Sequence, residues 1–152
     1  MIFVLKMLNR IVLFFIFLGI FSASFAIGAE VQVSEEESAI LLEELDELIA
    51  EIDAVGIFVH NASLSLPMFI PGFGVAWGAF AAFSTGMAFS VIKDASPMLA
   101  NVPSLTVLFM SPFGLMEVAA YSIAMSRSYM ICLLYTSPSP RDLSTSRMPS
   151  SA

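Results

Sequence analysis

The chain has 152 residues, of which 58% are hydrophobic and only 12% are charged, and its mean hydropathy is +0.88. Soluble domains carry about 25% charged residues, and a small soluble fold cannot hide so much apolar surface, so the composition excludes an ordinary soluble protein and predicts a membrane protein. The net charge of −7 comes from one segment, because ten of the 13 acidic residues lie between Glu30 and Asp53, and the few basic residues form no cluster that would suit nucleic acid.

Residues 1–29 are predicted to form an N-terminal transmembrane anchor. Lys6 and Arg10 precede an uncharged apolar run over residues 11–29, which is close to the ~20 residues needed to cross the hydrocarbon core. The alternative is a cleaved signal peptide, with a Ser-Phe-Ala cleavage site at residues 24–26. In both cases the positive charges favour a cytoplasmic N-terminus, with the following segment outside.

That following segment, residues 30–55, is predicted to form an acidic amphipathic helix over residues 34–53. Ser34 and Glu37 have the spacing of a capping box, which satisfies free backbone N–H groups at a helix start. The helix has no Lys or Arg on its polar face, which disfavours binding to anionic lipid. Its apolar side chains recur at helical spacing and form a stripe, which packs either on the rest of this chain or on a dimer or partner interface. The stripe consists of Leu41, Leu42, Leu45, Leu48, Ile49 and Ile52.

Residues 56–131 are predicted to form an incomplete membrane-embedded helical domain. Its first part is too long for one straight span, and Pro71 with Gly72 is a strong helix break. We therefore expect two helices, over residues 56–70 and 74–92. The first is short enough for a partial or re-entrant span, which is tolerated only where protein or a water cavity covers the broken backbone.

Small residues occupy every fourth position of the second of these helices. Such a ladder lets two helices approach closely in lipid. It therefore predicts tight helix packing, with a partner helix that is either internal or from another subunit. The ladder consists of Gly74, Gly78, Ala82, Gly86 and Ser90.

A loop is predicted over residues 95–104, followed by an apolar segment over residues 105–125 that is broken at Pro112 and Gly114. Glu117 follows in the first turn after this break, where its carboxylate lies near free backbone N–H groups. An acid within an apolar segment is costly and is often functional. Glu117 therefore either caps the broken helix or belongs to an intramembrane polar site.

His60 and Asn61 are further polar residues in apolar surroundings. They form either a structural hydrogen-bonding pair or a polar site shared with Glu117, while Arg127 is expected to be an interfacial anchor. A lone histidine is not a metal site, because zinc needs three or four ligands, and the one cysteine, Cys132, excludes an internal disulfide. The sequence contains no catalytic or nucleotide-binding motif. We therefore expect no catalytic residue, no metal and no cofactor.

Residues 132–152 are predicted to derive from a sequencing adapter and not from the native gene. The composition changes there from a membrane sequence to Ser, Pro and Arg. Reverse translation of residues 132–142 and 146–152 fits two constant blocks of an adapter for transposon-based DNA libraries, separated by a gap that suits a variable index. We therefore exclude this segment from the fold and expect the native protein to be truncated here near Ile131.

Three stretches resemble, in order and spacing, the stage II sporulation protein M family of membrane proteins, particularly its archaeal-type members. They are VHNASLSLPMFIPGFGVAWGAF, the following FSTG, and SPFGLMEVAAYSI. The family's Pro-His-Gly-x-x-E-x-x-A segment corresponds here to residues 112–120, with Phe113 where many members have His, which weakens a His–Glu pair. The resemblance covers residues 55–127. It implies an all-α multi-pass protein without catalytic chemistry and with at least one further helix after Arg127.

These observations predict an all-α, polytopic transmembrane helical bundle with broken or re-entrant helices, located in the cell membrane. The leading function is a non-enzymatic scaffold or assembly protein, similar to the family's namesake, which holds peptidoglycan-degrading enzymes in spore-forming bacteria. The small-residue ladder and the acidic helix are its candidate docking surfaces. Expected partners are the lipid bilayer, membrane or extracytoplasmic proteins and a second copy of the chain. The alternative is a transporter or channel subunit, because interrupted helices with nearby polar residues mark substrate paths.

Overall fold

The computed structural model describes residues 2–50 and 53–136, and this part of the chain is all-helical, as predicted. The predicted adapter-derived segment crosses the boundary of this part: residues 132–136 continue the last helix, and residues 137–152 lie outside the described residues. The described elements are α1 (Ile2–Gly28), α2 (Glu35–Ala50), α3 (Ala54–Ser65), the 3-10 helix η1 (Leu66–Phe69), α4 (Phe73–Ala95), α5 (Ser104–Met110) and α6 (Pro112–Thr136).

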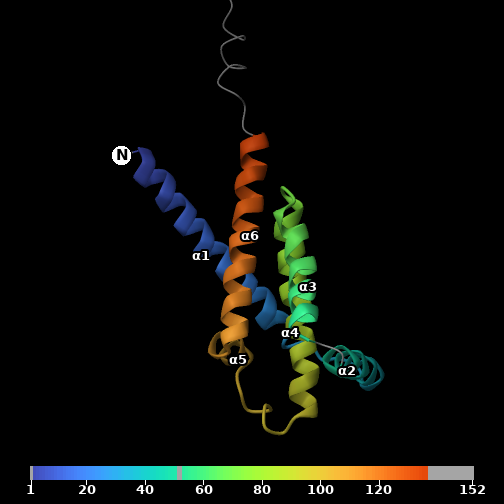
Figure 1. The fold of residues 1–152 in the computed structure, drawn as a ribbon. Coiled ribbons are helices and arrows are strands. Elements are labelled where there is room, and N and C mark those ends of the chain that lie inside the picture. Colours follow the sequence, from blue (N-terminus) through green and yellow to red (C-terminus); the bar gives the residue numbers. More distant parts are fainter. Residues whose placement is uncertain (1, 51–52, 137–152) are drawn as a thin grey trace, which may run out of the picture.

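Three of these helices, α1, α4 and α6, are long and apolar enough to cross a membrane. Their apolar stretches are Asn9–Gly28, Phe73–Ala95 and Pro112–Thr136, with 20, 23 and 25 residues. At about 1.5 Å per residue each reaches the ~30 Å thickness of the hydrocarbon core. α4 and α6 stand side by side, and α1 runs diagonally across them (Figure 1). The prediction of a multi-pass helical membrane protein is confirmed to this extent.

The core lies where α1 meets α4 and α6. Phenylalanines at every fourth position place their rings on one face of α1, and all three are buried. Each ring contacts an aromatic ring of a neighbouring helix, with centroid separations of 5.6, 5.6 and 6.1 Å, which lie in the favourable range for aromatic pairs. The pairs are Phe17 with Tyr129, Phe21 with Tyr121, and Phe25 with Phe89.

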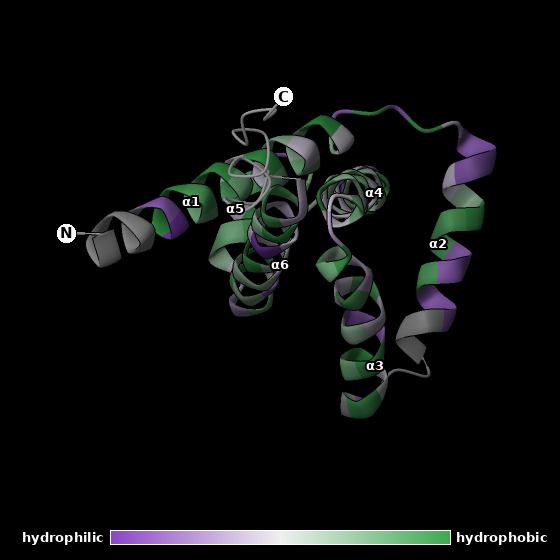
Figure 2. Cartoon of the chain, turned by 90° about the horizontal axis from the view of Figure 1, so that it is seen from above, coloured by the Kyte–Doolittle hydropathy of each residue, from purple (hydrophilic) through white to green (hydrophobic). Residues whose placement is uncertain are grey.

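The acidic helix α2 begins as predicted. The Ser34 hydroxyl donates to the Glu37 carboxylate at 2.9 Å, and the Glu37 N–H donates back to the Ser34 Oγ at 3.3 Å. α2 lies to one side of the other helices, joined to α1 by a short linker, and carries most of the hydrophilic colour in Figure 2. It packs chiefly on α4. The capping box therefore starts a helix that remains at the periphery.

Two predicted boundaries around α3 were wrong. Asp53 does not belong to the acidic helix but begins α3, because its carboxylate accepts the Gly56 N–H at 2.7 Å as an N-cap. The helix expected over residues 56–70 is α-helical only to Ser65. It then tightens into η1, because Pro67 has no N–H to donate and its ring crowds the carbonyl one turn earlier.

Candidate functional site

The small-residue ladder of α4 faces other helices of the same chain, and all five of its members are buried. A Cβ added to Gly74 would overlap the Met68 carbonyl of η1, and one added to Gly78 would meet the Met125 side chain of α6. At the other end of α4, the Ser90 hydroxyl donates to the Val31 carbonyl at 3.1 Å. The partner helices are therefore internal, and the ladder is not free to dock a second protein in this structure.

α1 and α4 approach so closely that their backbones touch through two glycines. A Cβ at Gly86 of α4 would overlap the Phe25 carbonyl of α1, and a Cβ at Gly28 of α1 would overlap the Phe83 carbonyl of α4. Each helix thus provides a glycine where the other presents a carbonyl group. Gly86 was predicted as a packing residue, whereas Gly28 was missed, because a single glycine at the end of an apolar run carries no ladder pattern.

The first predicted helix break lies in the turn between η1 and α4. Pro71 ends the incoming helix. Gly72 adopts a φ of 78°, a backbone conformation that residues other than glycine rarely adopt. The Ser128 hydroxyl of α6 donates to the Ile70 carbonyl at 2.6 Å, just before this turn. α6 therefore holds the turn that reverses the chain into α4.

The second predicted break separates α5 from α6. α5 ends at Met110, and α6 starts at Pro112. Proline suits the first position of a helix, because the N–H that it lacks would have no hydrogen-bond partner within the helix. The Ser111 hydroxyl accepts the Gly114 N–H at 2.9 Å and so caps the new helix. Gly114 packs beneath the Leu108 carbonyl of α5. Both breaks therefore produce the helix boundaries expected at Pro71 and Pro112.

Glu117 lies on α6, where it is half-buried in apolar surroundings. α3 packs against α6, and the His60 imidazole lies close enough to act on the Glu117 carboxylate electrostatically. His60 and Asn61 are both exposed. The packing of α3 on α6 therefore places the helices that carry His60 and Glu117 side by side, with His60 and Asn61 both on the exposed surface of α3. Among the described residues, no three His, Cys, Asp or Glu side chains gather into a metal site.

Tyr121 adds a polar group that sequence reasoning missed. It follows Glu117 by one helical turn, so both side chains lie on the same face of α6. Tyr121 is only 2% exposed, and its hydroxyl makes no hydrogen bond within the described part of the chain. The carboxylate and the hydroxyl are close enough to interact, although their geometry lies outside that of a formed hydrogen bond. The spacing of four residues from Glu117 would have pointed to Tyr121.

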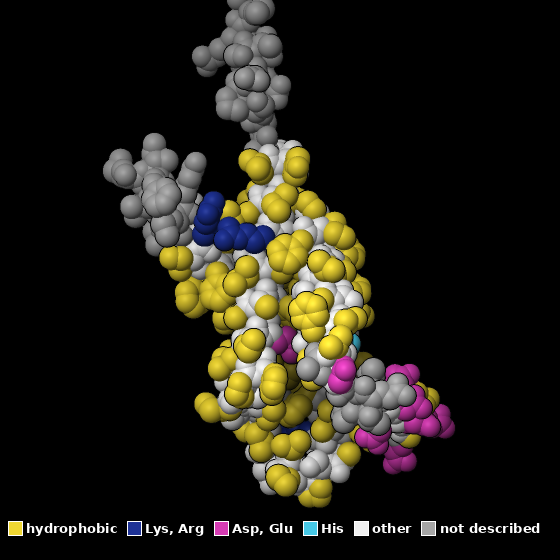
Figure 3. Space-filling model, in the orientation of Figure 1, with side chains coloured by type: hydrophobic (Ala, Val, Ile, Leu, Met, Phe, Trp, Pro, Cys, Tyr) yellow, Lys and Arg dark blue, Asp and Glu magenta, His cyan; other side chains and the backbone are white. Residues whose placement is uncertain are grey.

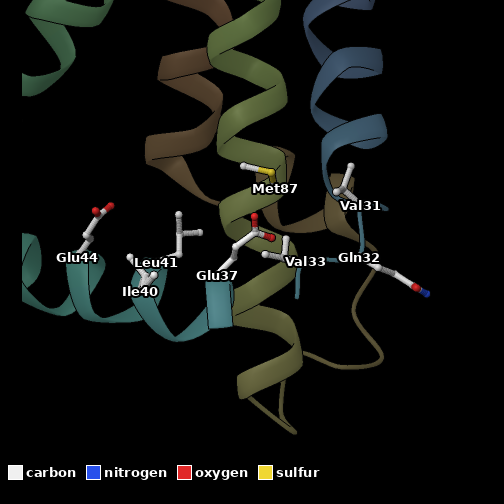
Figure 4. Close-up of a pocket in the computed structure, with 8 residues that line it drawn as sticks. All are labelled: Val31, Gln32, Val33, Glu37, Ile40, Leu41, Glu44 and Met87. Carbon is white, nitrogen blue, oxygen red and sulfur yellow. The ribbon is translucent and has the colours of Figure 1, made fainter. Parts of the chain in front are cut away.

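A groove with a volume of about 340 Å³ lies between α2, the linker that precedes it, and α4. In Figure 4 the side chains of Glu37 and Leu41 point from α2 toward α4, whereas Gln32 points away from the groove. Apolar side chains make up most of the lining, and two carboxylates stand on the α2 side. The lining residues are Val31, Gln32, Val33, Glu37, Ile40, Leu41, Glu44 and Met87.

Acidic side chains gather at one end of the helix bundle, whereas basic side chains lie at both ends. Figure 3 shows acidic side chains gathered over α2, whereas basic side chains lie beside the start of α1. Arg10 lies in the first half of α1 and Arg127 in the second half of α6, which both belong to the end opposite α2 (Figure 1). Lys93, in the last turn of α4, lies at the same end as α2.

Comparisons of the chain with protein-family models, with curated proteins and with solved structures found no match. The resemblance to the stage II sporulation protein M family therefore depends on its three motifs alone.

Proposed function

We propose that this chain is a non-enzymatic scaffold of the cell membrane, of the stage II sporulation protein M type, which holds partner proteins on the extracytoplasmic side. The observation that carries this proposal is the position of α2. It is an acidic amphipathic helix outside the packed bundle, and its apolar side chain Ile40 remains 58% exposed. An exposed apolar residue framed by carboxylates suits a protein interface better than lipid, because seven acids in α2 disfavour contact with an anionic membrane surface.

The proposed orientation places the N-terminus in the cytoplasm and α2 outside. Arg10 and Arg127 lie toward the end of the bundle opposite α2 and Lys93 lies at the α2 end, and an excess of basic residues favours the cytoplasmic side. Lys6 precedes the first span as well.

In this orientation α3 and η1 form a short, partial span that carries the chain from the α2 side toward the cytoplasmic end, because α4 starts after them and ends at the α2 end. The apolar stretch Val55–Phe69 is shorter than the three long helices, and at about 1.5 Å per residue it does not reach the ~30 Å of the hydrocarbon core. The chain then reverses at Gly72 into α4. The hydrogen bond from Ser128 to the Ile70 carbonyl covers part of the turn, as expected where backbone is broken at membrane depth.

Site-specific photocrosslinking in native membranes tests the scaffold proposal. A photoreactive amino acid replaces Ile40 on α2 or, as a matched control, Phe80 on α4, because these side chains are 58% and 59% exposed. We expect discrete protein adducts from position 40 and only lipid adducts from position 80. Lipid adducts alone from both positions, or the same protein adducts from both, would overturn the proposal.

A transporter or channel subunit is the second candidate, and the group around Glu117 favours it. Glu117 is a half-buried carboxylate beside the Tyr121 hydroxyl, which has no hydrogen-bond partner within the described residues. Such a polar group within an apolar bundle suits the binding of a proton or a cation on its way across the membrane. Proton flux into proteoliposomes, followed with an enclosed pH-sensitive dye, provides the test. Flux that Glu117→Gln abolishes and Glu36→Gln preserves supports this candidate, whereas absence of flux from the unsubstituted protein rejects it.

A further inference from the structure

The groove beside α2 is lined by apolar side chains, here called the apolar floor, and by two carboxylates of α2. The apolar floor consists of Ile40, Leu41 and Met87, and the carboxylates are those of Glu37 and Glu44. Glu37, Ile40, Leu41 and Glu44 recur at the spacing that places them on one face of α2, and each of them lines the groove. Met87 of α4 lies across from them (Figure 4). The two carboxylates therefore flank the apolar side chains along the helix axis, one on each side.

The segment that forms this wall contains no cation of its own. Residues 30–53 include ten acids and neither Lys nor Arg. The Ser34 hydroxyl occupies one oxygen of the Glu37 carboxylate, and Glu37 and Glu44 are both exposed. The groove therefore presents negative charge beside apolar surface, and a complementary occupant has positive charge beside apolar surface.

We propose that this groove binds a basic amphipathic segment of an extracytoplasmic partner protein. Apolar side chains of that segment lie on Ile40, Leu41 and Met87, and its Lys or Arg side chains reach Glu37 and Glu44. The volume of about 340 Å³ is at the lower end of the range of about 300–1,000 Å³ for ligand pockets, so a few side chains enter it and the rest of the segment lies outside. This inference rests on the proposed scaffold function, which places the groove on the extracytoplasmic side and makes its partner a protein.

Two other occupants fit the groove less well. An anionic lipid would bring its phosphate to a helix with seven acids in 16 residues, where like charges repel. A small inorganic cation would leave the apolar floor uncovered. A basic amphipathic peptide satisfies the carboxylates and the floor together.

The test measures binding of a fluorescent synthetic peptide, in which Leu and Lys alternate at helical spacing, to the full chain in phosphatidylcholine nanodiscs. Empty nanodiscs give the background, and peptides with Gln or Glu in place of Lys report the need for positive charge. We expect saturable binding of the Leu/Lys peptide above background, weaker binding of the Leu/Gln peptide and none of the Leu/Glu peptide. Raised salt should weaken the binding, because exposed charges are screened.

Two double variants locate the binding on the helix. Glu37→Gln with Glu44→Gln removes the groove carboxylates, and Glu36→Gln with Glu43→Gln removes two exposed carboxylates of α2 that do not line the groove. Both pairs have the same spacing and the same change in charge. Gln at position 37 also keeps a capping box, which accepts Glu or Gln there. We expect the first pair to raise the Kd about fivefold to tenfold, because each exposed ion pair contributes modestly, and the second to change it less than about twofold.

An Ile40→Ser variant tests the apolar floor. We expect it to weaken binding of the Leu/Lys peptide without unfolding the protein, because Ile40 is exposed. No binding above background, or equal weakening by both double variants, would overturn the proposal. Failure of the scaffold proposal is recognised separately, because the photocrosslinking experiment would then give no protein adducts from position 40. Protein adducts together with no peptide binding would reject the basic segment and leave the scaffold standing.

Discussion

α4 and α2 both carry regular residue patterns, but the structure uses the two patterns in opposite ways. The small residues of α4 are all buried against helices of the same chain. Two apolar and two acidic residues of α2 line an open groove, and one of them, Ile40, stays largely exposed. Small residues let backbones meet and so exclude other partners, whereas seven acids keep α2 out of the apolar bundle. Of the two predicted docking surfaces, the ladder is covered. α2 keeps an exposed apolar side chain at Ile40, outside the predicted stripe, whose members Leu41, Leu42 and Leu45 are half-buried.

The largest effect is expected where the backbones of α1 and α4 meet. Gly86→Ala places a methyl group on the Phe25 carbonyl, and neither backbone can move aside without disturbing its helix. We expect the variant to lose about 1–3 kcal/mol of unfolding free energy, as overpacked cores do. The measurement is unfolding of the purified protein by sodium dodecyl sulfate in mixed micelles.

Gly19→Ala is the matched control, because an added Cβ there has open space around it. The same substitution in a helix normally stabilises by up to about 1 kcal/mol. We therefore expect Gly19→Ala to be neutral or slightly stabilising. Equal behaviour of the two variants would mean that α1 and α4 do not meet as described, and the contrast between α4 and α2 would be lost.

A smaller effect is expected at the hydrogen bond that joins α6 to the turn before α4. Ser128→Ala removes the bond to the Ile70 carbonyl, with an expected cost of about 1 kcal/mol. Ser122→Ala is the control, since its buried hydroxyl donates only to Val118 of the same helix. The same unfolding assay should show a greater loss for Ser128. A loss of equal size would argue that α6 does not hold the turn.

Local chemistry made several features predictable from the sequence. Pro71 ends a helix and Pro112 starts one, because proline lacks an N–H. The small-residue ladder allows close helix contact, and Ser34 with Glu37 caps the first turn of α2. Each depends on a few neighbouring residues. Asp53 was assigned to the wrong helix, because the same acid can end one helix or cap the next, and only the backbone conformation decides.

The packing of α1 could not be predicted in the same way. Phe17, Phe21 and Phe25 form the buried face, but the run around them is apolar throughout, so periodicity shows no contrast between lipid-facing and core-facing residues. The groove is a second example, since it needs α2 and Met87 of α4 to be placed together. The nearness of His60 to Glu117 likewise depends on how α3 packs on α6.

The smallest effect on the whole protein is expected at the N-terminal cap of α2. It tests whether α2, unlike α4, lies outside the cooperative helix bundle. Ser34→Ala removes the side chain that accepts the Glu37 N–H, which costs a helix about 1 kcal/mol. Because α2 is peripheral, this cost should appear as local fraying. We expect amide hydrogen exchange in the first turn of α2 to rise about fivefold, with little change in the unfolding free energy or in the exchange of α4.

Ser38→Ala is the control for this substitution, because Ser38 lies in the same turn but inside the helix, where alanine is the better helix former. Exchange should therefore slow or stay constant in that variant. A fall in global stability with Ser34→Ala would show that α2 is part of the cooperative bundle, like α4. Its groove would then be structural packing, and an independent docking helix could no longer be inferred from its position.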